Sequence, residues 1–416
     1  MKKTISLFAV LASCVAGAEM MDRPGGFKIG ERMTIKPYVS LNYVYDSNAD
    51  QQKHGQHVSS WEITPGFGAA YKGDNWGVDL SAFYRYTAYS RYVRSLNENS
   101  YGEDLKFYWA NSAPDEKGWT LLFGEKYQKI AADDDKSENN GRGLWRDRET
   151  FLVSGAAERR FNERLHADVN ANYYYLDYAN RATKYANLYG WKRITVGAEA
   201  GYALSKWTDI IVAGNYMWYE QDNDKDRSGY SKYYDNSGHY SSKSKGYSVQ
   251  GGIASRATER ISYRALFGWT HFDYAGGVDK DDTPSYALSL NWKLSDTWNT
   301  MLLASRYYQP SERQFGTAVL VDAVSWGVAH SMIRGKLTST LDFAYRHEDR
   351  TFSDASAYKY DEDIFSARFG LNYTLNRFIT LFGRAEYQGC WFTGNAGNTD
   401  RDYDRFRGTL GFRLTY

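Results

Sequence analysis

The stretch Ile35-Lys36-Pro37-Tyr38-Val39-Ser40-Leu41-Asn42-Tyr43-Val44-Tyr45 alternates mostly apolar residues with polar or mixed ones. Successive side chains of a β-strand point to opposite faces, so this period of two predicts a strand with one apolar and one mixed face. The same alternation recurs at 61–71, 76–84, 165–173, 261–269, 286–292, 337–345, 365–373, 379–387 and 406–416. The sequence therefore predicts an all-β fold.

The connections between these segments are of two kinds. Short polar turns bracketed by apolar residues occur at 72–75, 161–165, 204–207, 257–261, 294–298 and 375–378. Nine longer polar stretches lie between them, at 46–57, 90–102, 131–146, 179–189, 220–246, 273–283, 309–316, 347–362 and 389–402. Nine hairpins predict about 18 antiparallel strands, an even number that suits a single closed up-and-down barrel. The period is blurred at 300–331, so the count is open by one hairpin.

Two features favour a membrane barrel over a soluble β-sandwich. Aromatic residues stand at the strand ends of the apolar rows, as in the pairs Trp61 and Tyr71 or Trp76 and Tyr86, which is typical of girdles at two lipid interfaces. The opposite rows carry charges, which a dry core would penalise and a wet lumen would not. We expect a transmembrane β-barrel over 33–416, with short periplasmic turns and long extracellular loops.

The N-terminal residues predict export. Lys2 and Lys3 precede an apolar run and the small residues Ala16-Gly17-Ala18, a pattern typical of a signal peptide cleaved after Ala18. Residues 19–32 would then form a periplasmic segment. A lipoprotein cleavage box ending at Cys14 is the competing interpretation. Cys390 is the one other cysteine, so no intramolecular disulfide is expected in the mature chain.

Charge and composition narrow the class of function. Lys and Arg number 51 against 50 Asp and Glu, which leaves no basic field for nucleic acid. Aromatic residues reach 17% with only 6 Pro, which suits many strands.

The chain resembles the outer-membrane β-barrel porins of Gram-negative bacteria, in particular a porin type two-like family. The resemblance rests on Ile35 to Asn48, on the recurring Leu-Ser/Asn-x-aromatic turns, and on the terminal Phe412-Arg413-Leu414-Thr415-Tyr416. It implies location in the bacterial outer membrane, contact with its lipid and lipopolysaccharide, and insertion by the barrel assembly machinery reading the strand that ends at Tyr416. The family supplies no catalytic residues.

The mixed rows supply the candidate site residues, because a barrel of this size encloses an aqueous channel. The charged pore-lining candidates are Lys36, Glu62, Asp79, Arg85, Arg264, Asp342, Arg346, Arg368, Arg384, Glu386, Arg407 and Arg413. On the last four strands and the first, basic residues outnumber acidic ones, which predicts either a wall that attracts anions or acidic sugars, or a solvated face of ion pairs. Four aromatic candidates for stacking on sugars or packing a loop are Tyr38, Phe83, Tyr174 and Phe382.

Other motifs carry little chemistry. Asp222-Asn223-Asp224-Lys225-Asp226-Arg227-Ser228-Gly229 lacks the glycine and the glutamate of a calcium loop, and His54 with His57 lacks a third ligand. We expect no metal, no cofactor and no enzymatic activity. The leading hypothesis is a channel for passive diffusion of small hydrophilic solutes or oligosaccharides. The alternatives are a barrel that exports or anchors extracellular polysaccharide, and a structural or adhesive surface protein.

Overall fold

The computed structural model describes residues 26–48, 57–90, 98–111, 117–130, 148–178, 190–221, 243–273, 280–310, 318–350, 360–394 and 402–416. The strands that these residues form are β1 (Phe27–Ile29), β2 (Met33–Asp46), β3 (Val58–Lys72), β4 (Trp76–Tyr89), β5 (Glu98–Ala110), β6 (Gly118–Ile130), β7 (Arg148–Arg160), β8 (Leu165–Tyr178), β9 (Trp191–Ala203), β10 (Thr208–Gln221), β11 (Lys243–Ser255), β12 (Ile261–Asp273), β13 (Lys280–Lys293), β14 (Trp298–Pro310), β15 (Ala318–Met332), β16 (Leu337–Arg350), β17 (Tyr360–Thr374), β18 (Ile379–Gly394) and β19 (Tyr403–Thr415). None of the described residues forms a helix long and apolar enough to cross a membrane.

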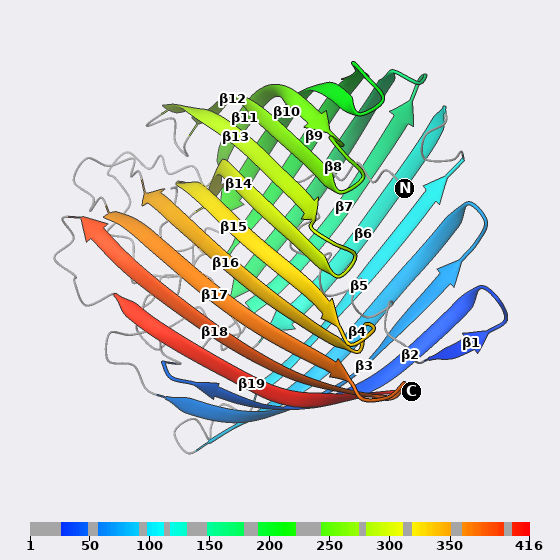
Figure 1. Ribbon diagram of the computed structural model, residues 1–416. Coiled ribbons are helices and arrows are strands. Elements are labelled where there is room, and N and C mark those ends of the chain that lie inside the picture. The colour runs from blue at the N-terminus through cyan, green and yellow to red at the C-terminus, as the bar shows by residue number, and fades with distance from the viewer. Residues whose placement is uncertain are drawn as a thin grey trace.

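Strands β2 to β19 form a closed antiparallel barrel of 18 strands, in which each strand pairs with its neighbours in sequence (Figure 1). The barrel closes where β19 pairs with β2, from Thr415 opposite Tyr38 to Arg407 opposite Asp46. We call this junction of first and last barrel strands the seam. The predicted fold class is confirmed, and closure leaves the barrel without an open sheet edge.

Strand β1 is an additional short element below the seam. It pairs with the start of β2, with Phe27 opposite Ile35, on the side of β2 that β19 occupies further up. The Phe27 ring contacts the Tyr416 ring at a centroid distance of 4.6 Å. The sequence pattern predicts no strand at 19–32, because three residues are too few to show a period.

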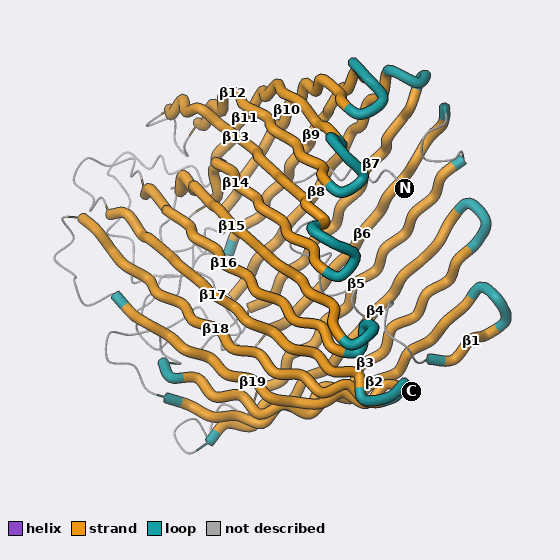
Figure 2. Tube along the Cα trace, viewed as in Figure 1, coloured by secondary structure: helices purple, strands orange, loops and turns teal. Residues whose placement is uncertain are grey.

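The short turns lie together at one end of the barrel (Figure 2) and share a hydrogen-bonding mechanism. Asn162 Oδ1 accepts the backbone N–H groups of Arg164 and Leu165, both at 2.8 Å. Asn376 does the same at its turn, and Ser205, Thr258 and Ser295 do so through their hydroxyl oxygens. Small side chains that bond the backbone two and three residues on stabilise tight turns.

One turn has a different geometry. Between β15 and β16, Ile333 and Arg334 have φ angles of 51° and 54°, and Gly335 follows at 82°. Positive φ suits glycine but is unusual for a β-branched residue. This turn follows the region 300–331, where the alternation in the sequence is blurred. In the structure that region forms β14 and β15.

The strands separate two faces as the alternation predicts. The outward rows expose large apolar residues, among them Trp61, Val249, Phe267, Trp326 and Leu410. The inward rows carry charged and small residues, together with local buried clusters such as the one formed by Tyr219, Phe272 and Tyr308. A face of exposed apolar side chains is what a barrel presents to lipid.

Candidate functional site: the lumen wall beside the seam

A row of alternating charges crosses the lumen wall beside the seam. Asp342 lies opposite Arg368, Arg368 opposite Glu386, Glu386 opposite Arg407, and Arg407 opposite Asp46. We call these five residues the charge row. Opposite charges on directly paired residues stabilise a sheet by about 0.2–1 kcal/mol per pair. Within the row, Arg368 Nε lies 3.0 Å from Glu386 Oε1.

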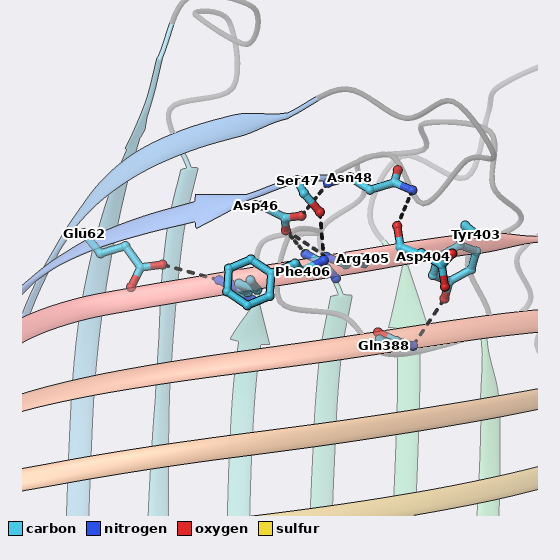
Figure 3. Close-up of polar contacts among 10 residues, drawn as sticks. Asp46, Ser47, Asn48, Glu62, Gln388, Tyr403, Asp404, Arg405 and Phe406 are labelled. Atoms are coloured by element: carbon cyan, nitrogen blue, oxygen red, sulfur yellow. Dashed lines mark hydrogen bonds and ion pairs between the residues drawn. The ribbon is translucent and has the colours of Figure 1, made fainter.

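The most buried ion pair of this wall bridges the seam itself. Arg405 of β19 donates from Nε to Asp46 Oδ2 of β2 at 2.8 Å, and its Nη2 donates to the same oxygen (Figure 3). The two side chains are 6% and 4% exposed. Because neither charge reaches much water, removing one partner would leave the other uncompensated.

Glu62 of β3 is a second acidic centre near the seam. Its carboxylate lies 3.8 Å from both Arg407 and Arg85 and accepts a hydrogen bond from Asn42 Nδ2 at 3.1 Å. These contacts tie β19, β2, β3 and β4 together. Arg407 and Arg85 are thus neutralised in part by one carboxylate.

Polar contacts continue the seam above the last strand pairs. Ser47 Oγ accepts the backbone N–H of Phe406 at 2.8 Å, and Asn48 Nδ2 donates to the Asp404 carbonyl at 2.8 Å (Figure 3). The junction between the chain's first and last barrel strands is therefore held by side chains as well as by the backbone ladder.

The lower part of the same wall is different. The Arg384 guanidinium carbon lies 5.7 Å from the Phe382 ring centroid, and that of Arg413 lies 4.7 Å from the Tyr38 ring centroid. Arginines placed over aromatic faces are held by cation–π attraction. We call Arg384, Phe382, Arg413 and Tyr38 the arginine–aromatic shelf.

The wall across the barrel carries a separate ion pair. Arg264 of β12 binds Glu199 of β9 with both guanidinium nitrogens, and Nη1 lies 2.9 Å from Glu199 Oε1. Higher on this wall, the Tyr174 ring contacts the Trp191 ring in a tilted arrangement at a centroid distance of 4.8 Å, and the Arg193 guanidinium carbon lies 5.6 Å from the Tyr174 ring centroid.

All of the charged and aromatic candidates lie on inward rows. Lys36 lies opposite Gly68, and Asp79 lies opposite Ala70 and Lys106. Arg346 forms an ion pair with Glu348, and Phe83 lies opposite Gly66 and Gly102. Their role as pore-lining residues stays a prediction.

Several inward charges were not singled out from the sequence. These are Asp46, Arg193, Glu199, Glu348, Glu362 and Arg405. Asp46, Glu348 and Glu362 had been assigned to loops, but β2, β16 and β17 extend to include them. Their positions in the period-two rows would have revealed them. With these carboxylates, the wall beside the seam is less basic than the sequence pattern predicts.

Some residues named in the sequence analysis fall outside the described residues: the acidic stretch 222–229, His54 and Cys14. Cys390 is described; it is buried and its thiol donates to Glu362 Oε1 at 3.1 Å. In the parts of the chain that the structure describes, no three His, Cys, Asp or Glu side chains are grouped so that they could hold a metal ion.

A closed barrel with an apolar outer face and a charged inner face defines an outer-membrane β-barrel protein. Residues 23–416 match the family described as "Putative beta-barrel porin 2", and the chain belongs to that family. The family resemblance drawn from the sequence is confirmed, and the protein is a porin-type barrel of a bacterial outer membrane.

Comparison with solved structures finds other outer-membrane barrels at low identity. The outer-membrane protein OpdK of Pseudomonas aeruginosa is 12% identical, with 92% of this chain and 99% of that chain covered and a TM-score of 0.44. The ferric enterobactin receptor PfeA of the same organism is 8% identical, with 92% and 81% covered and a TM-score of 0.45. Comparison with curated proteins finds no match.

Proposed function

We propose that the protein is a channel for passive diffusion of small hydrophilic solutes, with a preference for anions. The observation that carries the proposal is the charged inner face of a closed 18-stranded barrel. Barrels of 16 to 18 strands are wide enough to hold an aqueous channel. Solutes would pass by diffusion, filtered by width and by the charges of the wall.

The preference for anions follows from the distribution of charge. In the upper part of the wall beside the seam, arginines are matched by carboxylates, as Arg405 is by Asp46. In the lower part Arg384 faces the lumen with an exposed side chain, and none of the described carboxylates forms an ion pair with it. Positive charge that is not compensated locally attracts anions.

Proteoliposome swelling tests the channel. Folded protein should admit small neutral sugars at rates that fall steeply with solute size, and the heat-unfolded protein should admit none. A folded barrel that admits no solute would overturn the proposal and favour a structural or adhesive role. Passage of long polysaccharide chains together with small sugars would favour the export alternative.

The route to the membrane forms part of the same proposal. Residues 1–18 would act as a cleaved signal peptide, and the assembly machinery would read the strand that ends at Tyr416. N-terminal sequencing of protein purified from outer membranes should begin at Glu19. A lipid-modified N-terminus at Cys14 would contradict this.

We also propose that the protein has no enzymatic activity and needs no cofactor, since diffusion through a lumen requires neither. Chemical analysis of the solute inside and outside the vesicles checks that point, because the solute should be unmodified on both sides.

A further inference from the structure

We propose that the arginine–aromatic shelf is a binding site for small ring-bearing carboxylates inside the lumen. This inference rests on the proposed channel function and gives it a substrate class. A guanidinium of the site would bind the carboxylate of an organic acid. The ring of the acid would stack on the rings of Phe382 and Tyr38, which we call the aromatic floor.

The shelf has a regular order along two neighbouring strands. Arg384 lies opposite Thr409, Phe382 opposite Gly411, and Thr380 opposite Arg413. Phe382 thus occupies the inward position between the two arginines. Thr409, the residue opposite Arg384, precedes Arg413 by four residues on β19, which offsets the two arginine positions along the strands by roughly 13 Å at about 3.3 Å per residue.

Two glycines allow the rings of the aromatic floor to lie against the backbone of a neighbouring strand. A Cβ at Gly411 would lie 2.7 Å from Phe382 Cζ and 2.6 Å from Asn42 Oδ1. A Cβ at Gly66 would lie 2.4 Å from the Tyr38 ring. Both rings therefore lie directly on the backbone of the neighbouring strand, and a ligand ring could stack over them as on other aromatic platforms.

The surroundings of Arg384 suit an anion. The positions directly opposite it are Gly370 and Thr409, neither of which is acidic. Its neighbour Glu386 is engaged by Arg368 at 3.0 Å. A guanidinium offers a planar fork of donors that matches a carboxylate bidentately, and the ring at its back limits how it moves.

The upper arginines of the wall are poor alternatives. Arg405 is 6% exposed and bound to Asp46, and Arg407 is shared with Glu62. A solute carboxylate would have to displace a protein carboxylate at these positions, which costs more than it gains. The shelf is thus the part of this wall where a passing carboxylate meets an exposed guanidinium.

The test is block of single-channel current by added acids. Glucuronate and benzoate are the probes, and glucose and benzyl alcohol are their neutral counterparts. In wild-type channels the acids should shorten open times at concentrations where the neutral compounds have no effect. Arg384→Gln should weaken block about tenfold or more, because a charge-assisted hydrogen bond is lost. Arg413→Gln should weaken it as well.

Arg85→Gln is the matched control, since it removes one inward positive charge outside the shelf while its partner Glu62 keeps its contacts with Arg407 and Asn42. It should leave block within about twofold of wild type. Arg384→Lys keeps the charge without the planar fork and should bind the acids with intermediate strength. Heat-modifiable mobility checks that each variant is folded, and neutral-sugar flux checks that each is open.

The outcomes separate the two proposals. An absent conductance in the folded wild type overturns the channel itself. An open channel that passes neutral sugars but is blocked equally in wild type, Arg384→Gln and Arg85→Gln overturns the shelf alone. Block that is lost equally with Arg85→Gln also overturns it, because a diffuse positive field would then explain the effect.

Discussion

Arginines in the upper and the lower part of the wall beside the seam have different partners. Above, Arg405 and Arg407 bind Asp46 and Glu62 and close the barrel. Below, Arg384 and Arg413 lie over aromatic rings. Each upper arginine forms an ion pair with a carboxylate of another strand, whereas the residues directly opposite the lower arginines are glycine, threonine or serine. An inward arginine therefore supports the fold where a carboxylate of another strand reaches it, and Arg384, with which none of the described carboxylates pairs, can receive a solute.

The largest effect is expected when the buried seam pair is broken. Asp46→Ala leaves Arg405 charged and buried, which should lower the free energy of unfolding by about 3–5 kcal/mol. Urea or thermal unfolding in detergent micelles measures it.

Two variants control that result. Asp74→Ala breaks the exposed turn pair with Arg32, where the two side chains are 82% and 53% exposed, and should cost less than about 1 kcal/mol. The double variant Asp46→Leu/Arg405→Met should recover most of the loss. Equal losses for Asp46→Ala and Asp74→Ala would contradict the claim that burial makes the seam pair important for stability.

Crowding the aromatic floor should come next in size. Gly411→Ala places a methyl group 2.7 Å from the Leu41 carbonyl oxygen and from Phe382. Overpacking of this kind costs about 1–3 kcal/mol, and the displaced ring should also weaken block by glucuronate. Gly408→Ala is the control, since its new methyl would meet nothing closer than 3.6 Å. Unchanged unfolding and block in Gly411→Ala would refute the aromatic floor.

Loss of a single ring should have the smallest effect on stability. Phe382→Leu removes the cation–π partner of Arg384, worth about 0.5–1 kcal/mol at an exposed site, while keeping an apolar side chain. Block by benzoate should fall more than conductance in plain salt. If both are unaltered, the ring contributes nothing to the shelf.

The sequence was sufficient for the strands and their faces, because alternation is a local property. It placed Arg384, Phe382 and Glu62 on inward rows without any knowledge of register. It could not supply the pairing of charges, since Asp342, Arg368, Glu386, Arg407 and Asp46 come together only through the register of five strands. Asp46 was assigned to a loop for the same reason: the end of a strand is set by its partner, here β19.

Two further features were beyond local pattern. The β15–β16 turn places Ile333 at positive φ, against the preference of a β-branched side chain, so turn chemistry gave no signal there. Strand β1 exists through its pairing with β2 and the contact of Phe27 with Tyr416, both of which depend on the closed barrel.

The reversal potential in a KCl gradient, compared between wild type and Arg384→Glu, tests the account most directly. We expect an anion-selective wild-type channel whose preference is abolished or inverted in Arg384→Glu, while Arg85→Gln stays anion-selective. A folded, open wild-type channel that prefers cations, or an Arg384→Glu channel with the wild-type reversal potential, would contradict it.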